Sequence, residues 1–326
     1  MSSSITFQVM KCIDEVNGIG KSKRENRKRI KKGQEKYRHI HSYKTMEEVE
    51  KIGKQFARYV RENFGVNNLH ELKEQHYIEF LKSKSHLTLD YQRNIETNLR
   101  LVQEGFHKRA ERLGKEIVRF IPEKRIVSSR ERMEGVSNRS YTKDEIERLK
   151  GRVSASVNVS LSLMYNLGVR VSESVEIAVG DVDFQNNTVH VVGKGGRPRI
   201  VDIPENYKHE LRSLVQGKGL EDKLCPVKAG TVRNAIAKGF RKEGIKCKGA
   251  HGFRHTYARN QIKRIMTTEE RNLFQNCISR YAEGKAFDYG VHNRQLYDSM
   301  KAKMDYVHIQ LGHGKDRFDL AVRYMK

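Results

Sequence analysis

Four short segments in the second half of this 326-residue sequence carry residue types that suit phosphate chemistry. The first contains Arg170 and, three residues later, Glu173, and it directly follows the apolar stretch at residues 161–167. An arginine just past a helix end, with an acid to orient it, suits a phosphate clamp because the planar guanidinium donates two parallel hydrogen bonds. For this segment taken alone, a surface arginine is the alternative.

The second segment is a glycine-rich turn at residues 193–196 that contains Lys194. Its glycines leave the backbone bare, so a polyanion could approach Lys194 closely. It is not a P-loop, because the pattern GxxxxGK[ST] is not satisfied and no helix is expected to follow. Taken alone, the turn is more typical of a hairpin with a solvated lysine.

The third segment places His251 three residues before Arg254, followed directly by His255. One helical turn would bring His251 and Arg254 to the same face, where both could bind oxygens of one phosphate. A zinc site is a weaker interpretation, because His251 and His255 lack the glutamate of a zincin motif. We expect His255 to pack against the fold, and Glu173 to orient Arg170.

The fourth segment is Leu-Gly-His, ending at His313, with Tyr324 eleven residues later. A single tyrosine among fourteen would ordinarily be a core or surface residue. The significance of Tyr324 therefore depends on its occurrence after the other three segments.

The elements that must position these residues can be read from periodicity. A hydroxyl at Thr142 and a carboxylate at Glu145 have the form of a capping box, which predicts the first helix of a second domain. That domain is predicted to be mostly helical. Residues 188–192 and 199–203, separated by the glycine-rich turn, predict a β-hairpin that would carry Lys194 at its tip.

Residues 41–127 predict a small helical domain, because apolar residues recur at helical spacing in three stretches, the last ending near Gly114. A capping-box pattern at Thr45 predicts the start of its first helix. Residues 128–140 are polar and predict an interdomain linker. Residues 1–40 are interpreted as a basic arm, since residues 21–38 contain ten Lys or Arg and two Glu. A solvated tail is the alternative.

The charge balance indicates a polyanionic partner. Lys and Arg number 64 against 40 Asp and Glu, which gives a net charge of +24. Nucleic acid is favoured over a membrane, because no apolar run approaches the roughly 20 residues that span a bilayer. The four cysteines form no CxxC pair and are interpreted as thiols of a cytoplasmic protein.

Together the four segments resemble the signature of the tyrosine recombinases and phage-type integrases: an arginine in G-x-R-x-S-E, a hairpin lysine, H-x-x-R-H, L-G-H and a late tyrosine. The resemblance covers roughly residues 140–326. It implies a mainly α fold with a small β-hairpin or sheet. A helical core-binding domain at residues 41–127 would precede a mixed α/β catalytic domain at residues 141–326.

By this resemblance, Tyr324 is the nucleophile that forms a 3′-phosphotyrosyl link. Arg170 and Arg254 would stabilise the pentavalent transition state, since preorganised positive charge acts strongly in a water-poor site. Lys194 would protonate the 5′-hydroxyl leaving group. No ATP is needed because the phosphotyrosine conserves bond energy, and no metal or other cofactor is expected.

His251 and His313 would supply further hydrogen bonds and assist proton transfer. The implied partner is double-stranded DNA with inverted-repeat core sites, bound by a homotetramer that joins two such sites. The implied function is site-specific recombination for a mobile element. The implied location is the cytoplasm of a bacterial, phage or archaeal host, in association with the nucleoid. The sequence names neither the DNA site nor the direction of recombination.

Two spacings depart from the family pattern. Tyr324 lies two residues farther from the LGH segment than is usual, so residues 314–323 must bulge or wind differently. His251 and His313 are 62 positions apart, which indicates an insertion at residues 263–300. This insertion would be either a helical contact surface or a passive surface excursion.

Two alternatives stay open. A type IB topoisomerase would share the Arg, Lys, His and Tyr chemistry without needing a second duplex. A non-catalytic DNA-binding regulator would share the basic surface without needing Tyr324.

Overall fold

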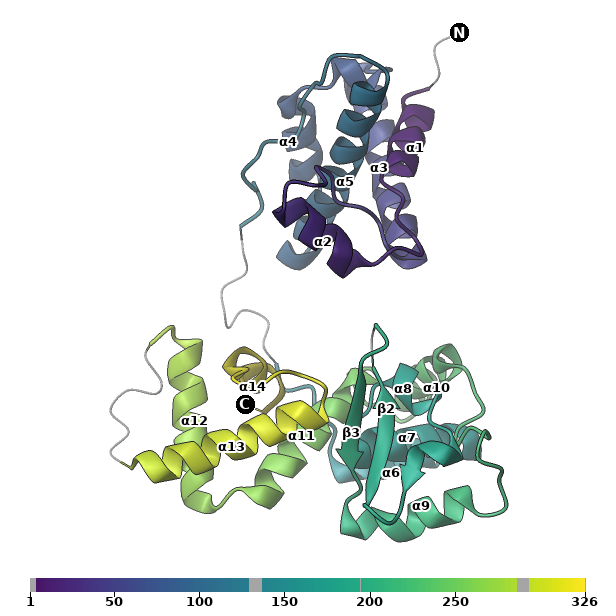
Figure 1. Cartoon of the computed structure of the whole chain (residues 1–326), viewed down its shortest axis with the longest axis vertical. Helices are drawn as coiled ribbons and strands as arrows, with labels where there is room; N and C mark the ends of the chain where they lie inside the picture. Colours follow the sequence, from purple (N-terminus) through teal and green to yellow (C-terminus); the bar gives the residue numbers. More distant parts are fainter. Residues whose placement is uncertain (1–3, 129–136, 194, 286–292, 326) are drawn as a thin grey trace. The chain divides into compact units, whose positions relative to one another are not determined.

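The structure is a computed structural model that describes residues 4–128, 137–193, 195–285 and 293–325. The chain divides into two compact units, Met1–Glu131 and Arg132–Lys326 (Figure 1). Most of the predicted linker at residues 128–140 lies outside the described residues.

Unit 1 is built from helices that share one hydrophobic core. Along the chain they are α1 (Ile5–Glu15), α2 (Lys23–Lys31), α3 (Tyr43–Phe64), the 3-10 helix η1 (Leu69–Glu71), α4 (Glu74–Lys82) and α5 (Leu89–Arg112). The hydroxyl of Ser42 caps α3 by accepting a hydrogen bond from the Thr45 amide at 3.2 Å. The start predicted at Thr45 is therefore wrong by three residues.

Helix α1 corrects the predicted basic arm at residues 1–40. Ile5, Val9 and Cys12 are fully buried, and α1 packs against α3 and α5 in the core of unit 1. Where α1 meets α5, a Cβ on Gly105 would lie 1.9 Å from the Cys12 carbonyl oxygen. The prediction gave weight to the basic residues 21–38 and overlooked the apolar spacing before them. Those basic residues are mainly exposed, and most of them lie on α2.

Unit 2 is mostly helical with a small antiparallel sheet of order β1-β2-β3, which confirms the predicted fold class. Its helices are α6 (Lys143–Lys150), α7 (Ala155–Leu167), α8 (Val171–Ser174), α9 (Lys208–Val215), α10 (Ala229–Lys242), α11 (His251–Ile265), α12 (Thr268–Ala282), α13 (Arg294–Gln310) and α14 (Phe318–Met325), with 3-10 helices η2 (Val179–Asp181) and η3 (Glu205–Tyr207). Its strands are β1 (Val182–Asp183), β2 (Thr188–Val192) and β3 (Pro198–Asp202).

The predicted hairpin is β2–β3, in which Val189 pairs with Val201, and β1 adds a short strand that was not predicted. The predicted capping box also forms, because the Thr142 amide donates to Glu145 at 2.7 Å and the Glu145 amide donates to Thr142 at 3.1 Å. The hairpin and the capping box were both predictable from sequence because their hydrogen bonds join residues close together in the chain.

Two hydrophobic clusters lie side by side in unit 2. One surrounds α7 and the sheet, and the other joins α11, α12, α13 and α14 (Figure 1). The predicted insertion at residues 263–300 supplies Phe274, Ile278 and Met300 to the second cluster, all fully buried. Its described part is therefore helical core and not a surface excursion. Residues 286–292 lie outside the described residues.

Within the part of the chain that the structure describes, no helix has the length and apolar character needed to cross a membrane.

We expect Gly105→Ala to destabilise unit 1 by about 2 kcal/mol, because the added methyl overpacks the α1–α5 contact against backbone. The measurement is urea unfolding of the full chain, with hydrogen exchange of the α1 and α5 amides to identify the transition of unit 1. Gly230→Ala, on α10, is the matched control, since a Cβ added there would meet no atom within 4 Å. Equal stability of the two variants would contradict the packing of α1 on α5.

Candidate active site

Arg254 ties together the ends of two helices in unit 2. It lies in the first turn of α11 and is fully buried. Its Nη1 donates to the carbonyl of Gly168, directly after α7, and its Nη2 donates to the carbonyl of Leu311, directly after α13, at 2.6 Å. Its Nε is buried and has no hydrogen-bond partner among the described residues. A buried donor without a partner is costly in a native structure.

Gly168 is needed at the α7 end for two reasons. Its φ is +63°, in the left-handed region that favours glycine. A Cβ at this position would also lie 2.4 Å from the ring of Tyr257 on α11. Close packing of α7 on α11 thus brings the Gly168 carbonyl to Arg254. It also brings Arg170, which is two residues after Gly168, close to α11.

Glu173 is the acceptor that fixes two further arginines. Its carboxylate accepts from Arg170 Nη1 at 2.7 Å and from the Arg170 amide at 2.8 Å. It also accepts from Arg199 Nη1 at 3.1 Å and Nη2 at 2.7 Å. Burial by itself would raise the pKa of Glu173, but the hydrogen bonds from Arg199 and Arg170 outweigh it and lower the pKa to about 2. The expectation that Glu173 orients Arg170 matches this geometry.

The hydroxyl of Tyr324 meets His251 directly, with Oη and Nε2 2.5 Å apart. Burial, together with the charges of Arg254, Arg139 and Arg170, lowers the pKa of His251 to about 4. His251 is therefore neutral at pH 7, and in the tautomer protonated at Nδ1 its Nε2 accepts a hydrogen bond from the tyrosine hydroxyl. This is the contact that a proton acceptor for a tyrosine nucleophile requires.

Two further histidines surround the Tyr324 ring. His255 stacks on it with ring centroids 4.4 Å apart and an interplanar angle of 11°. His313 meets it edge-on at 5.2 Å. His255 is buried, as predicted for a packing residue, and its stacking holds the tyrosine ring against α11.

The structure thus brings five predicted site residues into one part of unit 2: Arg170, His251, Arg254, His313 and Tyr324. Two helices position three of these residues: α11 carries His251 and Arg254, and α14 carries Tyr324. Lys194, the sixth, lies outside the described residues. Next to it, the Gly193 amide donates to the Arg197 carbonyl at 2.7 Å and closes the turn of the hairpin.

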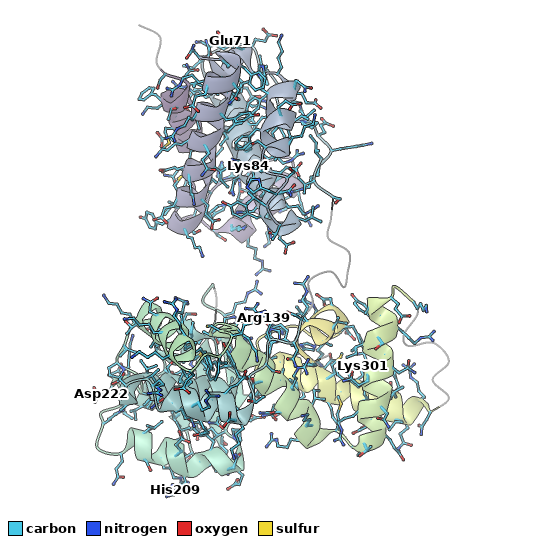
Figure 2. The ribbon with its side chains drawn as sticks, turned by 180° about the vertical axis from the view of Figure 1, so that it is seen from behind. Glu71, Lys84, Arg139, His209, Asp222 and Lys301 are labelled. Atoms are coloured by element: carbon cyan, nitrogen blue, oxygen red, sulfur yellow. The ribbon has the colours of Figure 1, made fainter. Side chains whose placement is uncertain are left out.

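Sequence reasoning did not identify Arg199 or Arg139 as part of this site. Arg199 Nε also donates to the Gln310 carbonyl at 3.0 Å, so it links the hairpin to the end of α13. Arg139, labelled in Figure 2, donates from Nη2 to the Lys248 carbonyl at 3.0 Å and lowers the pKa of His251. No local pattern distinguishes these two arginines from the many others in this basic chain.

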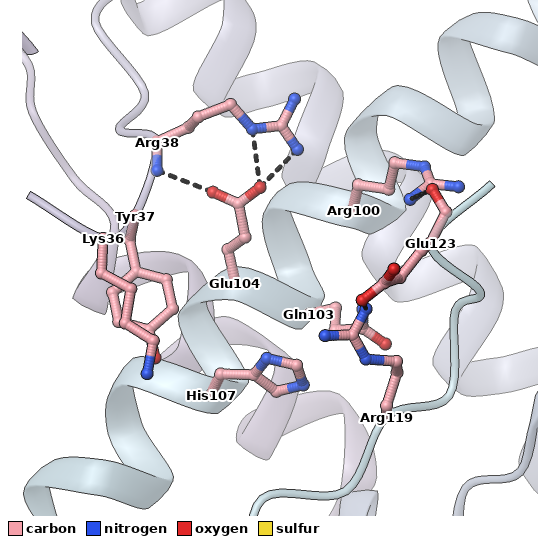
Figure 3. A pocket seen from close by; sticks show the side chains of 9 residues that line it. All are labelled: Lys36, Tyr37, Arg38, Arg100, Gln103, Glu104, His107, Arg119 and Glu123. Carbon is pink, nitrogen blue, oxygen red and sulfur yellow. Dashed lines mark hydrogen bonds and ion pairs between the residues drawn. The ribbon is translucent and has the colours of Figure 1, made fainter. Parts of the chain in front are cut away.

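A polar cavity of about 330 Å³ in unit 1 is also lined by basic side chains (Figure 3). There Arg38 donates to Glu104 from its amide at 2.7 Å and from its Nε at 2.6 Å. Arg119 pairs with Glu123 at 3.0 Å. Because these cations already have carboxylate partners, the cavity gives no argument for an anion site comparable to that around Arg254.

Comparisons with known proteins found similarity to one family over part of unit 2. Residues 139–270 match the phage integrase family. A tyrosine recombinase XerA of Saccharolobus solfataricus is 34% identical over 105 residues, which cover 32% of this chain and 36% of that protein. A tyrosine recombinase XerC of Bifidobacterium longum is 28% identical over 170 residues, covering 49% of this chain and 45% of that protein. The chain therefore aligns with less than half the length of either relative.

Solved structures show the same fold. Lambda integrase bound to DNA has a TM-score of 0.52 at 16% identity, covering 79% of this chain and 87% of that chain. The XerH site-specific recombinase bound to palindromic difH substrate has a TM-score of 0.53 at 18% identity, covering 90% and 84%. These similarities show that the chain has the fold of the integrase structures, a helical unit followed by a mixed unit with a small sheet. The region at residues 139–270 therefore matches the phage integrase family, and the chain is similar to tyrosine recombinases.

We expect Glu173→Gln to lower the free energy of unfolding by up to about 3 kcal/mol at pH 7. The folded pKa lies near 2, below the ordinary value of 4.5, so the carboxylate stabilises the fold above pH 4.5 and loses this contribution as the pH falls towards 2. Denaturant unfolding at pH 7 and at about pH 3 measures the change.

Glu176→Gln is the control for this measurement, since its carboxylate is 66% exposed and pairs with an exposed Lys223. Its effect should stay within about 0.5 kcal/mol at both pH values. A Glu173→Gln deficit that does not shrink at low pH would contradict the assigned ionisation.

Proposed function

We propose that this chain is a site-specific DNA recombinase that cleaves and rejoins DNA through a phosphotyrosyl link at Tyr324. The observation that carries this proposal is the hydrogen bond between the Tyr324 hydroxyl and Nε2 of a neutral His251, beside the guanidiniums of Arg254 and Arg170. A nucleophile, a proton acceptor and a positive clamp are the three groups that an attack on a phosphodiester requires.

In the proposed cleavage step, Tyr324 Oη forms a bond to phosphorus while the bond from phosphorus to the 5′ oxygen breaks. The hydroxyl proton passes to His251 Nε2. Lys194 is proposed to protonate the departing 5′ oxygen, in keeping with its place in the hairpin turn. Attack of a 5′ hydroxyl on the phosphotyrosine reverses these steps and rejoins the strand, so no external energy source is consumed.

Arg170 and Arg254 are proposed to hold the non-bridging oxygens of the phosphate. Arg170 is the accessible member of the pair, because 32% of its side chain is exposed while Arg254 is fully buried. Burial and the neighbouring Arg170 lower the pKa of Arg254 to about 10, so the guanidinium of Arg254 remains charged at neutral pH. Fixed charges in a site of low dielectric stabilise the developing negative charge of the transition state.

We further propose double-stranded DNA as the partner, with unit 1 as a DNA-binding unit and residues 141–326 as the catalytic domain. The net charge of +24 supports a polyanion. Each tyrosine can cleave one strand, and exchange between two duplexes breaks four strands. Four copies of the chain acting on two inverted-repeat sites are therefore the proposed assembly. The exposed basic residues 21–38 are proposed to contact phosphates from within unit 1.

Tyr324→Phe should abolish the covalent protein–DNA adduct while leaving DNA affinity within about threefold, because only the nucleophilic oxygen is lost. Nicked suicide duplexes of randomised sequence trap the adduct, and the enriched sequence then serves as substrate. Tyr306→Phe is the control, since it also removes a part-buried hydroxyl, bonded to Asp202 at 2.6 Å, without touching Tyr324. An adduct formed by Tyr324→Phe, or none formed by the wild type, would contradict the proposal.

Because Tyr324 and the groups around it belong to one chain, we expect cleavage in cis. Equal mixtures of Tyr324→Phe and Arg170→Ala proteins should then form no more adduct than the two variants assayed separately. If a neighbouring subunit donated the tyrosine, mixed assemblies would regain sites with both groups intact. A size tag on one variant identifies the attached subunit, and recovery of adduct on the Arg170→Ala chain would show cleavage in trans.

A further inference from the structure

A second histidine, His308, contacts His313 and has no part in the proposed chemistry. His308 lies near the end of α13 and is fully buried. Its Nδ1 is 3.3 Å from the Nδ1 of His313. The two residues are also joined through the backbone, because the His313 amide donates to the His308 carbonyl at 2.8 Å. A ring contact and a backbone hydrogen bond therefore both fix the position of His313 relative to His308.

A hydrogen bond between two neutral imidazoles allows two proton arrangements. In the first, His308 Nδ1–H donates to His313, which then carries its own proton on Nε2. In the second, His313 Nδ1–H donates to His308, which then carries its proton on Nε2. Burial lowers the pKa of His308 to about 4 and that of His313 to about 3, so both rings are neutral near pH 7.

The surroundings of His308 distinguish the two arrangements. Its Nε2 is buried and has no hydrogen-bond partner among the described residues. The second arrangement would leave an N–H donor orphaned at that position, and orphaned buried N–H groups are rarer than unpaired acceptors. The first arrangement leaves a lone pair there and moves the free N–H to His313, which is half-buried beside Tyr324.

The carboxylates near His308 already have other hydrogen-bond or ion-pair partners. Asp305, on the same helix, accepts from the Asp316 amide at 2.8 Å and from Lys301 at 3.2 Å. Asp319, on α14, pairs with Arg317 at 2.8 Å. None of these carboxylates has a hydrogen bond with His308 Nε2 in the structure, so they offer no acceptor for a proton at that nitrogen.

We propose that His308 is a positioning residue that fixes His313 in the tautomer protonated at Nε2. His313 then presents an N–H donor beside Tyr324, ready for a non-bridging phosphate oxygen. In the opposite tautomer it would present a lone pair, which repels such an oxygen. This inference rests on the proposed function for its consequence in cleavage, but the tautomer itself is a property of the free protein.

The first test is nitrogen-15 NMR of histidine-labelled full-length protein at pH 7, which distinguishes protonated from unprotonated ring nitrogens. Signals of His308 and His313 are assigned with single variants at each position. We expect the proton of His313 on Nε2 and that of His308 on Nδ1. A proton on His313 Nδ1 overturns the proposal, and this measurement on the wild type needs no active enzyme.

The second test compares two substitutions of similar size. His308→Asn keeps an N–H donor close to the position of Nδ1, whereas His308→Leu removes it. We expect single-turnover adduct formation on the selected suicide duplex to be about tenfold slower for His308→Leu than for His308→Asn. DNA affinity should be equal for the two, and His313 should become a mixture of tautomers in the leucine variant.

Equal cleavage rates for the two folded variants would overturn the role of His308. If the wild type forms no adduct with any duplex, the proposed function fails, while the NMR result still decides the tautomer. Thermal unfolding of both variants checks that a difference in rate does not reflect a difference in fold.

Discussion

Unit 2 depends on the hydrogen bonds that a single buried guanidinium makes with two helix ends. Arg254 donates to the carbonyls of Gly168 and Leu311, which follow α7 and α13. A charge buried in this way is tolerated only where hydrogen bonds satisfy it, so displacement of either helix end would carry a large cost. The same contacts bring the segments that carry Arg170 and His313 to α11, and they leave the Arg254 Nε without a hydrogen-bond partner among the described residues.

The electrostatic balance around this guanidinium explains the state of the neighbouring groups. Arg170 and Arg199 share the carboxylate of Glu173, which neutralises one charge and leaves an excess of positive potential. That potential adds to burial in lowering the pKa of His251 and His313, so both imidazoles are neutral. A site of this kind favours an anion, and it supplies neutral nitrogens that can accept a proton or donate one.

The unusual spacings of the sequence have structural counterparts in the second hydrophobic cluster. The segment between His251 and His313, which are 62 positions apart, contains all of α12 and α13, whose apolar residues share a cluster with those of α14. Before α14 the chain turns at Asp316, whose φ is +58°, and Lys301 (labelled in Figure 2) pairs with Asp316 and Asp305 across this turn. The added length therefore holds the helix that carries Tyr324 against α11.

Local patterns were sufficient for much of the fold and for the choice of site residues. The capping box at Thr142, the β2–β3 hairpin and the helical stripes follow from interactions within a few residues, which a sequence displays directly. The order of Arg170, Arg254, His313 and Tyr324 indicated the family whose pattern residues 139–270 match, because such a combination is improbable by chance. The basic segment misled the prediction for residues 1–40, because charge obscured the apolar face of α1.

Tertiary structure decided what each of these residues touches. The packing of α1 on α5 through Gly105, and the choice of Glu173 and not another acid as partner of Arg199, depend on residues far apart in the sequence. The sequence shows that His308 lies five residues before His313, but that spacing does not determine which ring nitrogens meet. Only the fold sets their distance and burial, and therefore the hydrogen bond between them.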